Sequence, residues 1–116
     1  TNSETFTDFT KLHFVLSVGG TEYVSQLPIT VAADTIYKLR ISIDSSRFAS
    51  IFVNGVQYNI SAVAGTAGTA VVAGGIPSIA LTDDTDFIPY IGVEAGAASA
   101  KSVNVYYEKI SRVLFE

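Results

Sequence analysis

The sequence predicts an all-β protein, and three observations support this prediction. Residues 36–60 alternate apolar and polar side chains almost without interruption, which is the period of a half-buried strand. Turn-forming pairs, Gly19-Gly20 and Asn54-Gly55, separate the alternating segments. No segment has the apolar spacing of a long amphipathic helix. Roughly seven or eight short strands are therefore expected, in the pattern typical of a β-sandwich.

The first expected hairpin lies near the N-terminus. Residues 9–18, FTKLHFVLSV, have the composition of a strand, and Gly19-Gly20-Thr21 has that of a turn. Residues 22–27, EYVSQL, are expected to return as the second strand. Because proline cannot donate to a sheet ladder, Pro28 predicts that residues 27–34, LPITVAAD, form an edge strand or a linking segment.

The segment 36–60 predicts an antiparallel meander with one buried face. In its first strand, one face consists of Tyr37, Leu39, Ile41 and Ile43, and the other of Lys38, Arg40, Ser42 and Asp44. Ile51 and Val53 alternate in the same way in the next strand. All five aliphatic side chains are expected in the core.

Two turns shape this meander. Residues 44–47, Asp-Ser-Ser-Arg, make the first turn. Asn54-Gly55 makes the second, and it is a strong signal for a type I′ hairpin because both residues tolerate a positive φ. Val56, Tyr58 and Ile60 then begin a third strand.

Residues 61–75, SAVAGTAGTAVVAGG, contain only small side chains and valines. Two interpretations stay open for this segment. It is a flexible surface loop, or it is an extended arm whose small side chains lie flat on a neighbouring subunit. Valine is unusual in a purely flexible linker. In the second interpretation, Val71 and Val72 supply apolar contact area.

Two further strands are expected near the C-terminus. Residues 88–93 form one of them, after an acidic turn at residues 82–86. Residues 102–115, SVNVYYEKISRVLF, alternate again and form the other. Residues 1–116 are therefore interpreted as a single β-sandwich domain, of a length that is usual for one domain.

Composition excludes several classes of function. The net charge is −4, and the 7 Lys and Arg residues are scattered. Neither nucleic acid nor an acidic membrane surface is therefore an expected partner. The longest apolar stretches are far shorter than the ~20 residues of a membrane-spanning helix. The chain contains no Cys, which excludes disulfides and thiolate metal sites.

Few residues offer reactive chemistry, so no enzyme, cofactor or metal site is expected. His13 is the only histidine and lies within an apolar strand, and no serine has the GxSxG context of a nucleophile. A structural role for His13 is favoured. Asp83, Asp84 and Asp86 form the only carboxylate cluster. Their spacing differs from that of a calcium-binding EF-hand loop, and a solvated acidic turn is favoured over a calcium site.

Composition also favours association with other proteins. Charged residues make up only 16% of the chain, below the usual quarter. Phe52 and Tyr106 fall on strand faces opposite the expected core. Because the chain has no Trp, the commonest sugar-stacking residue, these rings favour a protein interface over a glycan site. The candidate interface residues are Val71, Val72, Phe52 and Tyr106, and a homo-oligomer is expected.

Two stretches carry a resemblance to a known group of proteins. ADTIYKLRISIDSSRFASIFVNGVQY resembles the core of concanavalin A-like jelly rolls. LTDDTDFIPYIGVEA, with the later AKSVNVYYEKISR, is similar to the C-terminal strands of jelly-roll proteins of tailed bacteriophages. The resemblance covers about residues 31–112. Such jelly rolls are usually longer on the N-terminal side, so first strands that are missing, short or supplied by a neighbour are consistent with it.

The resemblance implies an antiparallel jelly-roll β-sandwich and a non-enzymatic structural role in a bacteriophage virion. The favoured role is a capsid-surface decoration protein whose partners are copies of itself and other capsid proteins. The alternative is a domain of a tail fibre or spike that recognises a host glycan. A glycan hydrolase of this fold is disfavoured because no pair of facing carboxylates is evident. No binding residue can be transferred from the group to this chain.

Overall fold

The computed structural model describes residues 6–77, 79–82 and 102–111. The chain divides into two units, Thr1–Asp86 and Phe87–Glu116, which are described separately. All six strands of the described residues lie in the first unit, and the described residues contain no helix. The prediction of an all-β protein is therefore confirmed.

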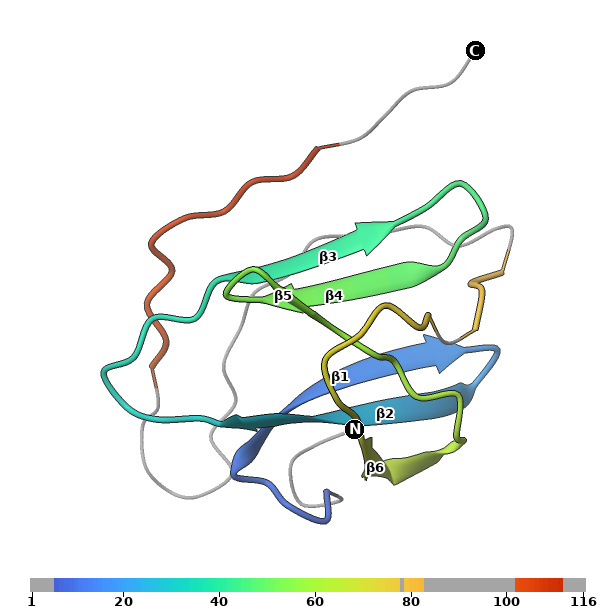
Figure 1. Cartoon of the computed structure of the whole chain (residues 1–116), viewed down its shortest axis with the longest axis horizontal. Coiled ribbons are helices and arrows are strands. Elements are labelled where there is room, and N and C mark those ends of the chain that lie inside the picture. Colours follow the sequence, from blue (N-terminus) through green and yellow to red (C-terminus); the bar gives the residue numbers. More distant parts are fainter. Residues whose placement is uncertain (1–5, 78, 83–101, 112–116) are drawn as a thin grey trace. The chain divides into compact units, whose positions relative to one another are not determined.

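The first sheet contains β1 (Lys11–Val18), β2 (Thr21–Thr30) and β6 (Gly65–Ala70), in the order β1-β2-β6 (Figure 1). β1 and β2 are antiparallel, whereas β6 runs parallel to β2. Gly19 and Gly20 join the hairpin with φ angles of 58° and 82°. These positive angles match the twist of the two flanking strands, which confirms the predicted hairpin.

Pro28 lies inside β2, which is the central strand of this sheet. β6, however, pairs with β2 only as far as Gln26, so among the described residues the part of β2 around Pro28 has a strand on one side only, and residues 31–38 form no strand. The prediction of an edge strand or linking segment is therefore confirmed for this part of the chain. The sheet tolerates the proline because the β6 ladder ends at Gln26 and the β1 ladder is irregular between Lys11 and His13. Neither neighbour requires a backbone N–H from residue 28.

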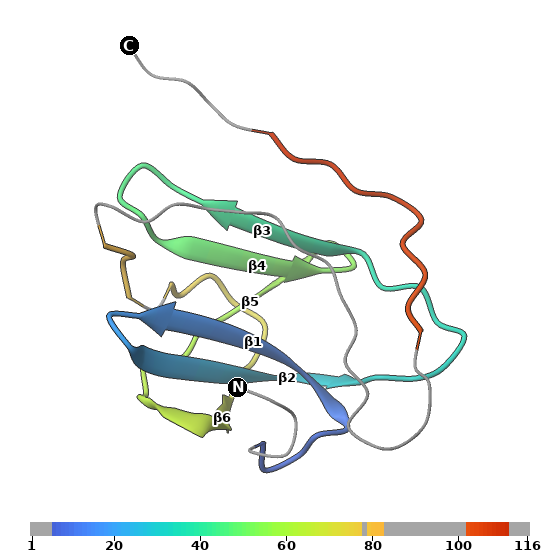
Figure 2. The same ribbon diagram turned by 180° about the vertical axis from the view of Figure 1, so that it is seen from behind.

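The second sheet contains β3 (Leu39–Ile43), β4 (Ala49–Val53) and β5 (Val56–Tyr58), in that order (Figure 2). Both strand pairs are antiparallel. Asn54 and Gly55 connect β4 to β5 with φ angles of 51° and 82°. The predicted meander and the predicted positive φ angles are both confirmed.

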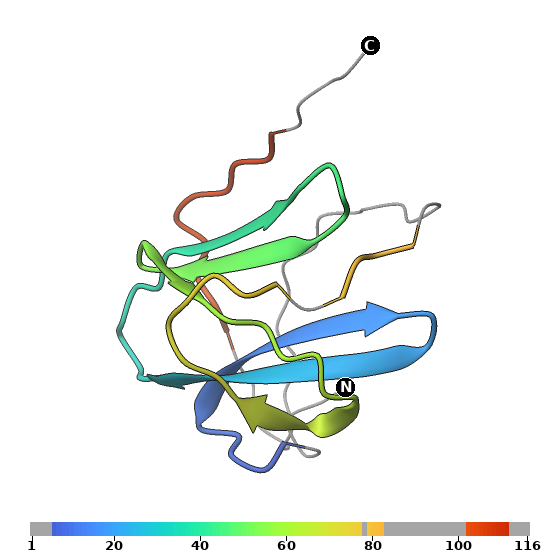
Figure 3. The ribbon, with the colours of Figure 1, turned by 45° about the vertical axis from the view of Figure 1, so that its right-hand side comes forward.

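The core lies between the two sheets, which form two layers (Figure 3). Its buried cluster consists of one residue of β2, three of β4 and one after β5: Leu27, Ala49, Ile51, Val53 and Ile60. The fold is thus compatible with a β-sandwich. The predicted burial of Ile51 and Val53 is confirmed, since each is only 4% exposed.

The predicted burial of the β3 side chains is wrong. Leu39, Ile41 and Ile43 are 61%, 63% and 39% exposed. They lie on the same face as the buried side chains of β4, because Ile41 is opposite Ile51 in the register. Among the described residues, however, β3 is an edge strand, and the first sheet packs mainly against β4. Alternation identified the correct face of β3, but it could not show whether that face is covered.

Residues 61–75 pair with strands of their own chain and are therefore not a free loop. Gly65–Ala70 is strand β6 of the first sheet, and residues 71–74 return to the second sheet. There, Asn59 N–H donates to Val72 O at 2.9 Å, and Gly74 N–H donates to Gln57 O at 3.0 Å. Whether this segment also contacts another subunit stays a prediction.

The small side chains of this segment allow close packing within the chain. A Cβ atom at Gly68 would lie 3.1 Å from Cδ2 of His13, and a Cβ atom at Gly74 would overlap the side-chain amide of Asn59. The glycines at these two positions are therefore explained by contacts within the chain, without a neighbouring subunit.

The second unit is described only at residues 102–111, which form no strand and are exposed. The prediction of a strand is wrong for these residues, because alternation alone does not supply the hydrogen-bonded neighbour that a strand requires. The strand predicted at residues 88–93 lies outside the described residues.

Candidate functional site

The aliphatic side chains of β3 form an exposed surface. This surface is here called the β3 apolar face and consists of Leu39, Ile41 and Ile43. Two of the three side chains are more than 60% exposed. Soluble proteins rarely expose contiguous apolar side chains unless the surface binds something. This face is therefore the strongest candidate interaction surface of the described residues.

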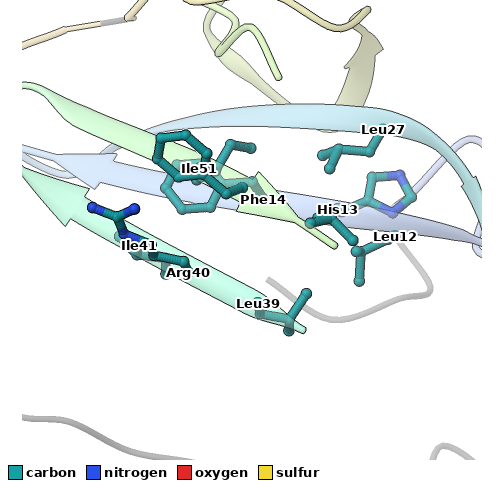
Figure 4. Close-up of a pocket in the computed structure, with 10 residues that line it drawn as sticks. Leu12, His13, Phe14, Leu27, Leu39, Arg40, Ile41 and Ile51 are labelled. Atoms are coloured by element: carbon teal, nitrogen blue, oxygen red, sulfur yellow. The ribbon is translucent and has the colours of Figure 1, made fainter. Parts of the chain in front are cut away.

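Leu39 and Ile41 of the β3 apolar face line one side of a groove (Figure 4). Its volume is about 140 Å³, and side chains of both sheets line it, among them Leu12, Phe14 and Ile41. Among the described residues that line it, only His13 and Arg40 are polar or charged. The groove thus offers apolar contact area and few groups that could donate or accept a hydrogen bond.

The opposite face of β3 is polar. Arg40 lies opposite Phe52 in the register, and its guanidinium carbon is 4.9 Å from the centre of the Phe52 ring. This cation–π contact covers part of the ring, which is only half-buried. Phe52 therefore lies on the face opposite the core, as expected, although the side chain of Arg40 shields it.

The four predicted interface residues lie in different surroundings. Val71 packs against the core, whereas Val72 is 65% exposed. Phe52 lies under Arg40, and Tyr106, which is 75% exposed, belongs to the other unit. Their role in an interface stays a prediction.

The alternating pattern predicted a core position for the β3 apolar face, and no signal in the sequence distinguishes a covered strand from an edge strand here.

His13 lies on β1, and its ring is packed against other parts of the chain. Its Nδ1 lies 2.9 Å from the carbonyl oxygen of Lys11, so this nitrogen carries the proton and donates. The ring stacks on Phe6, with the ring centres 3.9 Å apart and the planes at 17°. Nε2 is buried with no hydrogen-bond partner among the described residues. These contacts are those of a packed aromatic ring.

The predicted acidic cluster of Asp83, Asp84 and Asp86 lies outside the described residues. Within the described ranges, no group of three His, Cys, Asp or Glu residues could hold a metal ion, and no helix is long and apolar enough to cross a membrane.

The Thr10 hydroxyl and backbone N–H donate to Asp8 and lower the pKa of that carboxyl. Asp8 precedes β1 and does not line the groove.

Comparisons with family models, with curated proteins and with solved structures found no match for this chain.

Proposed function

We propose that this chain is a non-enzymatic structural protein of a bacteriophage virion, which adopts a jelly-roll sandwich and binds the capsid surface as an oligomer. The resemblance of residues 31–112 to phage jelly-roll proteins motivates the proposal that the chain belongs to a virion. The two-layer arrangement of the strands is compatible with such a sandwich. The exposed apolar surface motivates a role that depends on contact with other proteins.

The observation that carries this proposal is the β3 apolar face. Transfer of apolar surface out of water stabilises a complex by about 25 cal/mol per Å². Leu39 and Ile41 are 61% and 63% exposed. Burial of these side chains against a partner would therefore stabilise the complex. A protein that works inside an assembly can bury such side chains against its neighbours.

The groove favours a protein partner over a glycan. Sugars are held by several convergent hydrogen bonds together with stacking on a ring, whereas aliphatic side chains dominate this groove. Arg40, the one charged residue among the described residues of the lining, is already stacked on Phe52. Recognition of a host glycan at this groove is therefore disfavoured.

The experiment starts from phage particles purified from the source that encodes the chain. Quantitative mass spectrometry should find this chain in a fixed ratio to the major capsid protein, and cryo-electron microscopy should place it on the shell. Particles that lack the chain would contradict the proposal. Density at the tail tip, together with binding on a glycan array, would replace it with a receptor-recognition role.

A matched pair of variants tests the surface itself. Ile41→Lys places a charge on the β3 apolar face and should reduce incorporation into particles. Val15→Lys changes an exposed aliphatic residue on β1, 39% exposed, and should leave incorporation unchanged. Equal incorporation of the two variants would show that the β3 apolar face is not the contact surface.

A further inference from the structure

The outer edge of β3 has backbone groups that are available for pairing. Asp44 N–H donates to Phe48 O at 3.0 Å, and Asn54 N–H donates to Lys38 O at 2.8 Å. Even-numbered residues of this segment therefore direct their backbone groups toward β4. The N–H and C=O groups of Leu39, Ile41 and Ile43 must point the other way. Among the described residues, no strand pairs with this edge.

We propose that the edge of β3 pairs antiparallel with β3 of a second copy of this chain, around a two-fold axis at Ile41. This inference rests on the proposed function, because it names the partner of the same surface. Ile41 then lies opposite Ile41 of the second copy, and Leu39 lies opposite Ile43 of the second copy. All of these residues direct backbone groups outward, so each opposed pair exchanges both hydrogen bonds.

Charge complementarity favours this register over one with the axis at Arg40. With the axis at Ile41, Lys38 lies opposite Asp44 of the second copy, and Arg40 lies opposite Ser42 of the second copy. A register with the axis at Arg40 would place two arginines directly opposite each other, which is destabilising. A shift by one residue would bring the apolar face of one copy beside the polar face of the other.

The axis at Ile41 also uses the whole strand. All five residues of β3 find a partner, whereas an axis at Ser42 would place Leu39 opposite Ser45 of the second copy, in the turn that follows β3. The proposed pairing joins the second sheet of one copy edge to edge with the second sheet of the other. It also brings the β3 apolar faces of the two copies side by side. Each aliphatic side chain of that face then gains an aliphatic neighbour across the axis.

A pairing of two short strands is small beside a standard protein interface. We therefore expect it to depend on protein concentration in solution and to be stable where many copies are held close together, as on a shell. A covalent trap detects such a contact, and the chain provides a clean background because it has no natural cysteine.

The test mixes two single-cysteine variants, Arg40→Cys and Ser42→Cys, under mild oxidation. Residues opposite each other without mutual hydrogen bonds have Cα atoms about 4.5 Å apart, within disulfide range. The mixture should form a disulfide-linked heterodimer. A control mixture of Arg40→Cys with Ser17→Cys, an exposed position on β1, should form only background amounts.

Charge variants test the same register without cysteine chemistry. Lys38→Glu places like charges opposite Asp44 of the second copy and should weaken self-association in sedimentation velocity. Lys11→Glu changes the net charge equally on β1 and should leave self-association unchanged. Adding Ile41→Lys to both cysteine variants should abolish the cross-link, while circular dichroism confirms that the fold is retained.

Each contrary outcome has a distinct meaning. Cross-linking of Arg40→Cys with itself, but not with Ser42→Cys, would overturn the register. No cross-link, together with slow amide exchange of Leu39, Ile41 and Ile43 in a monomer, would show that another segment of the same chain covers β3, and the inference would fail. No cross-link in a chain that is nevertheless present on particles would overturn this inference and leave the proposed function standing.

Discussion

Two adjacent glycines after β6, Gly74 and Gly75, differ in what surrounds them. A Cβ atom at Gly74 would overlap the side-chain amide of Asn59, whose Oδ1 accepts the N–H of Ile76 at 3.0 Å. A Cβ atom at Gly75 would lie 3.5 Å from Oε1 of Gln57, which is an ordinary contact. Neither glycine has a positive φ, so the difference between them is steric.

This difference predicts unequal effects of the same substitution. Gly74→Ala should lower the free energy of unfolding by about 1–3 kcal/mol, because Asn59 must move and its hydrogen bond is disturbed. Gly75→Ala should have little effect and serves as the control. Urea denaturation followed by circular dichroism measures both. Equal stabilities would show that Asn59 relaxes at no cost.

At the scale of elements, β3 and β4 have the same alternating pattern but opposite exposure. Ile51 on β4 is 4% exposed, whereas its register partner Ile41 on β3 is 63% exposed. Sequence alternation is similar in the two strands, and only the position within the sheet distinguishes them. Within the part of the chain that the structure describes, β4 has a strand on each side and the first sheet against its inner face, while β3 is at the edge.

Truncation should therefore affect the two isoleucines very differently. Ile51→Ala should cost about 2–5 kcal/mol of unfolding free energy, because it leaves a cavity in the core. Ile41→Ala should cost less than about 1 kcal/mol in dilute monomer, where its side chain remains largely in water. Chemical denaturation at low protein concentration makes the comparison. A large loss at Ile41 would mean that its side chain is covered in solution.

The Asn54-Gly55 turn is held by backbone conformation and by one side-chain contact. Gly55 has a φ of 82°, and a Cβ atom added there would meet nothing within 4 Å, so space does not limit this site. Gly55→Val should nevertheless cost about 1–2 kcal/mol, since a β-branched residue is strained at positive φ. Thermal unfolding provides the measurement, with Asn54→Gly as a comparison that keeps the positive φ.

The Asn54→Gly comparison removes a specific hydrogen bond. Oδ1 of Asn54 accepts the backbone N–H of Lys38 at 2.9 Å, at an exposed position where water can replace it. A smaller loss is therefore expected for Asn54→Gly than for Gly55→Val. The reverse order would show that this contact, and not the backbone conformation, stabilises the hairpin.

At the scale of the whole molecule, one buried hydroxyl links the first sheet to the chain that leaves the second. Ser25 on β2 is fully buried, and its Oγ accepts the N–H of Ser61 at 2.8 Å. The Oγ of Ser61 in turn accepts the N–H of Val63 at 3.0 Å. These bonds fix the path of the segment that crosses from β5 to β6.

Ser25→Ala should lower the free energy of unfolding by about 1–3 kcal/mol, because the N–H of Ser61 would be left buried without a partner. Ser17→Ala, at an exposed position on β1, is the matched control. Hydrogen exchange should also show faster exchange across residues 61–70 in the Ser25 variant alone. Unchanged stability would indicate that a water molecule replaces the hydroxyl.

The local structure could be read from the sequence. Alternation in residues 39–43 and 49–53 placed two strands and identified their common face, because side chains of a strand point alternately to its two sides. Gly19-Gly20 and Asn54-Gly55 placed two hairpin turns, because few residues other than these adopt a positive φ at low cost. These features depend on neighbours in sequence, so the sequence was sufficient.

Only the tertiary structure decided which strands lie at an edge and where the small-residue segment goes. The sequence could not show that β3 leaves its aliphatic face exposed, since coverage depends on which distant strands pack there. It also could not show that Gly65–Ala70 joins β2 as a parallel strand, because that pairing joins residues about forty positions apart and has no local signature. The candidate interaction surface arises from this difference: the sequence determined that β3 has an apolar face, and the tertiary structure left that face exposed.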